Sequence, residues 1–384
     1  MAEYAVVDGV PQGLPAEFDE LVIDSATTCR VLEPAEYYDA TPLSWPKSSI
    51  TKAMVAARTI GNSFFGMHAN DAAAEFSVSH GTVRSHDSQF AGQSLRWNSI
   101  EPSDGGFNWA SMDAWVAAHA GKDLIYVAGF CPAWATATTA VSGPYGTGTA
   151  QFPNLTHWAD FLTQVATRYS SSIKYWEICN EVNVAEFWVG THTQLAQMMR
   201  VASQTIKAID PTAKIISPSI VGIEATSART YLANILDASD GAASNGAAWM
   251  DLCGVHTYCN ADIVKSTAAM YTDVRTVLST RGHSATPIWS TEVGMNNPKW
   301  ANLPVAHRNV LLQRTMAMHA ACGFDRCCWY GWDYTNGYAL NDGEGGLTAW
   351  QDAIEYLTSG EITAANVLYD GRVAMKVNGV NRLF

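Results

Sequence analysis

The chain has 384 residues, of which 48% are hydrophobic, which is enough to bury a large core in one large domain or two small ones. Its formal net charge is −13 and it has no run of basic residues. This charge balance argues against nucleic acid as a partner and against a polybasic membrane anchor, because both depend on clustered Lys and Arg.

No stretch of the sequence is long and apolar enough to span a bilayer, so we expect no membrane partner. The first residues show neither the basic region nor the apolar region of a signal peptide. The localisation is therefore open: a cytoplasmic protein, a particle-associated one such as a phage component, or a chain that lacks its signal.

The eight Cys are scattered without the paired spacing of a zinc site. Several of them, such as Cys131, Cys179 and Cys253, lie in apolar strand-like runs, so we expect buried thiols and leave one or two disulfides open. The ten His include no HExxH motif and no pair at ligand spacing. We expect neither a metal ion nor another cofactor.

Residues 1–61 are interrupted by several Pro and show no chemical motif. A short helix is predicted over residues 50–60. We interpret the segment as an N-terminal extension that packs on the main domain or serves attachment, and residues 62–384 as one catalytic domain with a C-terminal tail.

From residue 62 onward, β-branched and aromatic runs alternate with helical patterns. Eight strand-like runs occur: Ser63–Asn70, Gln93–Pro102, Asp123–Trp134, Ile173–Asn183, Lys214–Gly222, Met250–Tyr258, Thr286–Met295 and Asp325–Asp333. Apolar residues at three- and four-residue spacing predict helices over 155–169, 195–206, 231–236, 271–278 and 304–318. Eight strand–helix units predict an α/β fold, the (β/α)8 TIM barrel.

Several other enzyme classes lack support in this sequence. Neither GxGxxG nor GxxxxGK[ST] occurs, which argues against a nucleotide-binding sheet, and GxSxG is absent, which argues against an α/β-hydrolase. No Lys lies centrally in a predicted barrel strand, so a Schiff-base enzyme has little support.

Two Glu residues end predicted strands. Asn180 and Glu181 follow strand four, and Glu292 ends strand seven. In a barrel both would lie at the catalytic mouth, nearly opposite each other. Apolar walls would raise the pKa of Glu181, as a general acid requires, and a carboxyl separation of roughly 5–5.5 Å would make glycoside hydrolysis retaining.

Further polar and aromatic residues fall at predicted strand ends and are candidates for substrate binding: His68, Arg96, Trp134, His256, Tyr258 and Trp332. Ordinary structural roles remain open for most of them. Arg96 could form an ion pair, Trp134 could pack a loop, and His256 or Trp332 could belong to the core. Glu177 is interpreted as structural.

The ordered set of these residues resembles the pattern of clan A glycoside hydrolases, the retaining enzymes with Glu on strands four and seven. The segments Leu95-Arg-Trp-Asn-Ser-Ile-Glu-Pro102 and Gly106-Phe-Asn-Trp-Ala-Ser-Met-Asp113 are most similar to family 39 and next to family 5. The resemblance implies the following roles: Glu181 as acid/base, Glu292 as nucleophile, Asn180 binding a 2-hydroxyl, Tyr258 holding the nucleophile and Trp332 flooring the −1 subsite.

Two functions from different classes fit the sequence. The first is a retaining glycosidase acting inside a β-linked polysaccharide, since Tyr145, Phe187, Trp188 and Trp300 lie in loops expected to border an extended groove. The alternative is a non-catalytic carbohydrate-binding barrel with an adhesive or structural role. Both imply a polysaccharide or oligosaccharide partner, and two carboxylates favour the enzyme because binding alone does not need them.

Overall fold

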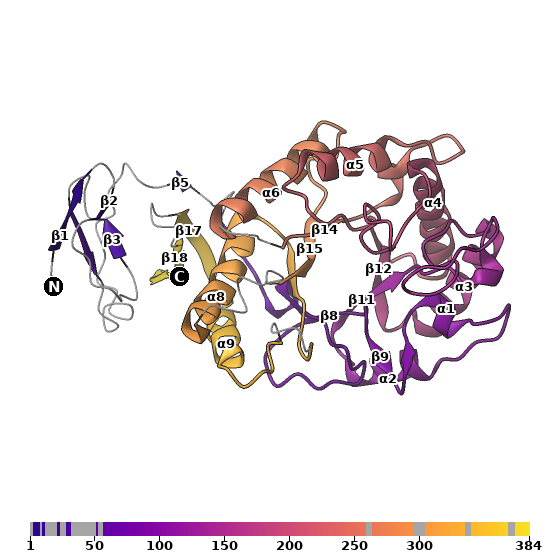
Figure 1. Cartoon of the computed structure of the whole chain (residues 1–384), viewed down its shortest axis with the longest axis horizontal. Coiled ribbons are helices and arrows are strands. Elements are labelled where there is room, and N and C mark those ends of the chain that lie inside the picture. Colours follow the sequence, from indigo (N-terminus) through magenta and orange to yellow (C-terminus); the bar gives the residue numbers. More distant parts are fainter. Residues whose placement is uncertain are drawn as a thin grey trace.

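The chain folds around a nearly closed barrel of parallel strands (Figure 1). The computed structural model describes residues 3–7, 10–11, 21–23, 28–31, 51–52, 57–258, 263–294, 304–334, 339–367 and 373–384. Eight strands form the barrel sheet in the order β13-β12-β11-β8-β7-β16-β15-β14. Isolated parallel bridges, Ile216–Leu252 and Ile220–Val255, join the two ends of this order.

The barrel strands have these bounds: β7 Phe65–Met67, β8 Thr82–Arg84, β11 Asp123–Ala128, β12 Ile173–Ile178, β13 Lys214–Ile216, β14 Cys253–His256, β15 Ile288–Val293 and β16 Arg326–Trp329. Most of their residues are buried, as expected for parallel strands covered on both faces. The predicted (β/α)8 barrel is confirmed.

Helices follow one another around the outside of the strands (Figure 1). Their bounds are α1 Trp97–Ile100, α2 Ala110–Ala118, α3 Leu155–Tyr169, α4 His192–Ile209, α5 Thr226–Asp237, α6 Ile263–Ser279, α8 Val305–Cys322 and α9 Gly346–Leu357. Local signals set several ends. Asn154 caps α3, Thr191 and Gln194 form a capping box on α4, and Gly323 ends α8 in the left-handed conformation.

The barrel interior is filled by side chains from several strands. Ile125, Ile216, Leu252, Trp289 and Cys328 form one buried cluster. Such filling makes the barrel a packed core and leaves only its rim available for chemistry. Among the cysteines, Cys131, Cys179, Cys253 and Cys328 are buried free thiols, and burial raises the pKa of Cys179 to about 12.

The second barrel strand is not where the sequence pattern placed it. Within Gln93–Pro102, Gln93–Ser94 (β10) pairs antiparallel with Gln89–Phe90 (β9), and Trp97–Ile100 forms the short helix α1. The barrel strand is instead β8, which has three residues. So short a strand is hard to detect from sequence. The longer segment Leu95–Ile100 lies outside the barrel sheet and buries its apolar residues Leu95, Trp97 and Ile100 in the core.

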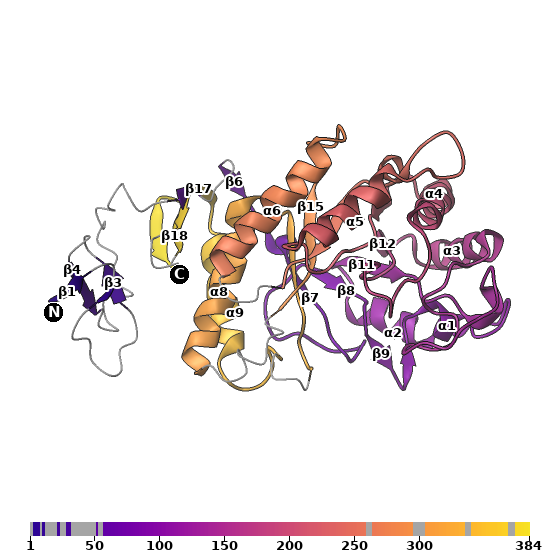
Figure 2. The same ribbon diagram turned by 45° about the horizontal axis from the view of Figure 1, so that its top comes forward.

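A second sheet joins the two ends of the barrel domain (Figure 2). The C-terminal strands β17 (Glu361–Val367), β18 (Val373–Val377) and β19 (Val380–Leu383) pair with β5 (Thr51–Lys52) and β6 (Arg58–Thr59). The helix predicted over residues 50–60 is therefore wrong within the described residues, because these residues supply edge strands to β17.

Four short strands near the N-terminus form a sheet of their own, which lies apart from the barrel in Figures 1 and 2. They are β1 (Glu3–Val7), β2 (Val10–Pro11), β3 (Leu21–Ile23) and β4 (Thr28–Val31), in the order β2-β1-β4-β3. The attachment role of residues 1–61 stays a prediction. Within the described residues, no helix combines the length and apolar character needed to cross a membrane.

Candidate active site

A buried arginine organises the carboxyl ends of three barrel strands. Arg84 ends β8 and is fully buried. Its Nε and Nη2 donate to the two oxygens of Glu177 on β12 at 2.8 and 2.6 Å, and its Nη1 donates to Glu292 Oε2 on β15 at 2.8 Å. Nη2 also donates to Asn180 Oδ1 at 2.9 Å. The planar guanidinium thus fixes two carboxylates and an amide at once, which a lysine could not do.

Glu292 is held on both carboxylate oxygens. While Arg84 donates to Oε2, the hydroxyl of Tyr258 donates to Oε1 at 2.5 Å. The side chain of Glu292 is only 7% exposed. Its carboxylate is therefore oriented from two sides and nearly withdrawn from water.

Glu181 reaches the same place from the loop after β12. The backbone turns sharply there, with Cys179 at φ 66° and Glu181 at φ 38°. Ser219 steadies the turn by accepting a hydrogen bond from the Glu181 amide at 3.1 Å. Nδ1 of His256, at the end of β14, lies 2.7 Å from Glu181 Oε1.

The two Glu face each other across a short gap. One carboxylate oxygen of Glu181, one of Glu292 and a ring nitrogen of His256 lie within 4.8 Å of one another. Among the described residues these three are the one His, Cys, Asp or Glu group compact enough for a metal ion. However, both Glu292 oxygens already accept hydrogen bonds and the Arg84 charge is adjacent, which disfavours a cation.

The pKa of Glu181 is shifted in the opposite direction from the one expected from the sequence. Burial raises the pKa of Glu181, but the hydrogen bond and charge of His256, with weaker contributions from His86 and Arg84, lower it below its usual range. The predicted rise is therefore wrong for this structure. Apolar walls alone suggested it, and the sequence does not show that His256 would donate directly to this carboxylate.

Comparisons with known proteins agree with this geometry. The family model described as glycosyl hydrolase family 10 matches residues 53–231, a segment that contains Arg84, Glu177 and Glu181 and ends before Glu292. Among solved structures, a family 39 glycoside hydrolase from Bacteroides cellulosilyticus has a TM-score of 0.63 at 15% identity, covering 84% of this chain and 70% of that one.

Two further solved structures share the barrel. A family 39 β-xylosidase from Caulobacter crescentus has a TM-score of 0.57 at 16% identity, with 85% of this chain and 80% of that one covered. A glucosidase from Croceicoccus marinus has a TM-score of 0.60 at 14% identity, with 85% and 74% covered. At these identities the structural likeness shows the fold, and the family model adds the class of activity.

The chain is a glycoside hydrolase similar to the retaining enzymes of clan A. The resemblance to this clan is thereby confirmed, as is the expectation of an enzyme, and the non-catalytic binding barrel is set aside. A carbohydrate is the substrate of this glycosidase.

The structure brings some of the predicted site residues together with the two Glu. Asn180, His256 and Tyr258 each contact Arg84 or a Glu carboxylate, as described above. His68 lies beside them, with Nε2 3.0 Å from the carbonyl oxygen of Thr291, the residue before Glu292.

Three other predicted residues have different surroundings. Arg96 precedes α1 instead of lying on a barrel strand, and its guanidinium pairs with Asp87 at 2.7 Å. Trp134 packs edge-on against Trp97 and donates to the Glu101 carbonyl. Trp332 is 4% exposed and meets the ring of Phe76 in the core. The role of Trp332 at the floor of the −1 subsite stays a prediction.

The sequence pattern missed a polar group beside the glycosidase site. Asp87 accepts hydrogen bonds from Arg96 and from the hydroxyl of Tyr330 at 3.0 Å, and its carboxylate lies 3.3 Å from His86 Nε2. Tyr330 follows β16, and its ring packs on His68 at 5.3 Å. The run Val83-Arg-Ser-His-Asp87, a strand end followed by polar residues, was the available signal.

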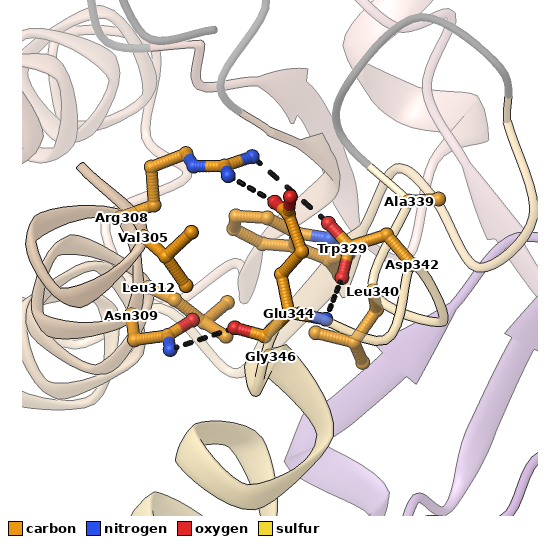
Figure 3. Close-up of a pocket in the computed structure, with 10 residues that line it drawn as sticks. All are labelled: Val305, Arg308, Asn309, Leu312, Trp329, Ala339, Leu340, Asp342, Glu344 and Gly346. Carbon is orange, nitrogen blue, oxygen red and sulfur yellow. Dashed lines mark hydrogen bonds and ion pairs between the residues drawn. The ribbon is translucent and has the colours of Figure 1, made fainter. Parts of the chain in front are cut away.

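A separate small cavity lies where β16 ends between α8 and α9 (Figure 3). Its volume is about 40 Å³, far below the roughly 300–1,000 Å³ of ordinary small-molecule sites. Arg308 in its wall is paired with Glu344, and Asp342 lies 3.9 Å away. The cavity is too small for a sugar ring, and its charges are paired within the protein.

Proposed function

We propose that this glycosidase cleaves β-glycosidic bonds by double displacement, with Glu292 as nucleophile and Glu181 as acid/base. The observation that carries the proposal is the approach of their oxygens to within 4.8 Å. This is close to the roughly 5–5.5 Å separation of carboxyl groups in retaining enzymes and too short to admit the water of an inverting reaction.

In the first step, Glu292 Oε attacks the anomeric carbon while the protonated Glu181 gives its proton to the departing oxygen. The C–O bond of the glycoside breaks and an ester bond to Glu292 forms. In the second step, ionised Glu181 removes a proton from water, which attacks the same carbon and releases Glu292 as a carboxylate. His256, 2.7 Å from Glu181, favours its ionised form and so suits the second step.

The surrounding residues support these roles. Tyr258 and Arg84 hold the two oxygens of Glu292, which limits rotation of the nucleophile. Asn180 accepts from Arg84 through its carbonyl oxygen, so its amide nitrogen can donate to a substrate hydroxyl, which fits the 2-hydroxyl role.

We propose further that the substrate is a β-linked polysaccharide cleaved internally. Tyr145 and Phe187, from the loops after β11 and β12, stack at 5.1 Å and offer an aromatic wall near the acid/base. Trp188 is buried and does not contribute, while Asn296, Asn297 and Trp300 lie outside the described residues. Because neighbouring structures are named a β-xylosidase and a glucosidase, β-xylans and β-glucans come first in a substrate panel.

Azide distinguishes the two carboxylates. We expect Glu292→Ala to lose nearly all turnover, and added azide to yield the inverted α-glycosyl azide, because the small anion takes the place of the nucleophile. Glu181→Ala with azide should yield the retained β-glycosyl azide from an activated aryl glycoside. Glu186→Ala, an exposed carboxylate in the same loop, is the matched control and should keep wild-type activity. The roles are reversed if the two products are exchanged.

The mode of cleavage is tested by the products of the wild-type enzyme. Early release of mixed oligosaccharides from a polysaccharide supports internal cleavage. Release of monosaccharide alone from the first turnover contradicts it and leaves the two Glu roles intact.

A further inference from the structure

Strand β15 contains one extra residue just before Glu292. Toward β14, the pair Val255–Ser290 is followed by His256–Glu292, which skips Thr291. Toward β16, Ser290–Cys327 is followed by Val293–Trp329, so three steps on β15 match two on β16. The pairings with β14 and with β16 therefore both place a β-bulge in β15, directly after Ser290.

The bulge allows Ser290 and Glu292 to face opposite sides of the sheet. In a regular strand, residues two apart point the same way. Here Glu292 points into the barrel mouth toward Arg84, whereas Ser290 Oγ lies 2.6 Å from Thr257 Oγ1. Thr257 in turn contacts His319 of α8, which covers the outside of the barrel (Figure 1). Without the extra residue, the side chain of Glu292 would face the same side of the sheet as Ser290 and would point away from the barrel mouth.

The polar contacts behind the bulge have defined directions. His319 is fully buried, and burial lowers its pKa to about 4, so its ring is neutral. Its Nδ1 lies 2.7 Å from the Thr315 carbonyl oxygen, which can only accept, so Nδ1 is the donor. Nε2 must then accept from Thr257 Oγ1 at 2.7 Å, and Thr257 Oγ1 accepts from Ser290.

Thr257 links this buried cluster to both catalytic carboxylates. Its amide donates to the Glu292 carbonyl at 3.0 Å. Its two neighbours on the chain face the opposite side, where His256 contacts Glu181 and Tyr258 contacts Glu292. Movement of Thr257 would therefore shift the backbone of Glu292 and the side chains that hold both carboxylates.

We propose that Ser290, Thr257 and His319 are positioning residues, which lock the β15 bulge from behind so that Glu292 is aimed at the anomeric carbon. The inference rests on the proposed role of Glu292 as nucleophile. None of the three side chains is recorded in contact with the carboxylate of Glu181 or Glu292, whereas Ser290 Oγ donates to the Glu292 carbonyl oxygen at 3.4 Å. Each therefore acts through the backbone of β15 and of the segment that follows β14.

Three variants test the cluster. Thr257→Val keeps the volume and removes the hydroxyl, His319→Leu removes the acceptor, and His319→Gln restores an acceptor in its side-chain carbonyl. Thr82→Val is the matched control, because Thr82 is an equally buried strand hydroxyl that bonds Ser63 and Arg326 at the opposite end of the barrel.

The readouts are kcat, KM, the melting temperature and the rate of covalent labelling by 2,4-dinitrophenyl 2-deoxy-2-fluoro-β-xyloside and the corresponding glucoside. We expect Thr257→Val and His319→Leu to lower kcat and the labelling rate by about tenfold to a hundredfold, since small misplacements of reacting groups have effects of this size. KM should change less. His319→Gln should recover most of the labelling rate, and Thr82→Val should change only the melting temperature.

The inference is overturned if folded Thr257→Val labels at the wild-type rate, or if Thr82→Val slows labelling as much as Thr257→Val. If His319→Leu does not fold, the labelling rates of Thr257→Val and His319→Gln still test the positioning role. A wild-type enzyme that hydrolyses none of the β-glycosides is a different result, since it refutes the proposed function rather than the positioning role.

Discussion

Arg84 is the residue on which the charge balance of the site depends. It is 0% exposed and pairs with Glu177, also 0% exposed, and with Glu292. Such a buried group is stable only as a whole, because removing one charge leaves the others unpaired in a poorly solvated place.

We therefore expect Arg84→Ala to lower the free energy of unfolding by about 3–5 kcal/mol and to abolish activity. The measurement is urea unfolding beside Arg168→Ala, whose pair with Asp113 is 43% and 46% exposed. That surface pair should be worth at most about 1 kcal/mol. Equal losses in the two variants would contradict the account of Arg84.

The pH dependence depends on the contact between His256 and Glu181. The first step requires protonated Glu181, and a lowered pKa means that this form is lost at a lower pH than for an ordinary Glu. The activity kcat/KM should therefore fall as pH rises through that lowered pKa.

In His256→Ala the hydrogen bond and charge that lower the pKa of Glu181 are gone, while burial still raises it. We expect the alkaline limb of kcat/KM to move to higher pH, even if the maximal rate falls. His80→Ala is the control, since His80 is a buried histidine bonded to the Val78 carbonyl. A limb that stays in place, or moves to lower pH, would rule out this role of His256.

At the scale of single residues, the sequence predicted the site residues that lie at the ends of long strands. Glu181, Glu292, His256 and Tyr258 were predicted from apolar runs that stop on a polar side chain, and all four lie together. Arg84 was missed because its strand has only three residues. The direct contact between His256 and Glu181 depends on side-chain geometry that no local pattern encodes.

At the scale of elements, the predicted helices α3, α4, α5, α6 and α8 all occur, because their apolar stripes have the period of a helix. The failures concern short strands that depend on distant partners. β5 and β6 have two residues each and exist only by pairing with β17, three hundred residues along the chain from β6. The bulge in β15 is likewise invisible without β14 and β16.

The pairing of β5 and β6 with β17 predicts where the chain tolerates truncation. Removing residues 1–50 should leave the melting temperature and activity unchanged, whereas removing residues 1–61 takes two strands from the second sheet and the 3.1 Å pair of Arg58 with Asp325. We expect the melting temperature of the shorter chain to fall by about 2–4 °C for each kcal/mol lost. Identical melting curves for the two truncated chains would contradict this division.

At the scale of the whole molecule, the barrel follows from the alternation of strands and helices, and its C-terminal rim collects what the strand ends carry. The predicted number of eight barrel strands is correct although one strand was predicted at the wrong residues. The strand β8 takes the second position along the chain, which the sequence pattern assigned to Gln93–Pro102. The second sheet and the N-terminal sheet do not have this alternation of strands and helices. Their strands carry no repeating pattern, so the sequence did not reveal them.

The central claim is that Glu292 forms a covalent bond to the substrate, while Glu181 donates a proton in the first step and accepts one from water in the second. The most direct test is to trap that bond with a 2-deoxy-2-fluoro-β-glycoside of a sugar the enzyme hydrolyses, and to locate it by mass spectrometry of the digested protein. The account predicts one sugar per chain, on the peptide that contains Glu292, and slow recovery of activity when the sugar is released. A label on another residue, or complete turnover of the substrate to the inverted anomer with no labelled protein, would contradict it.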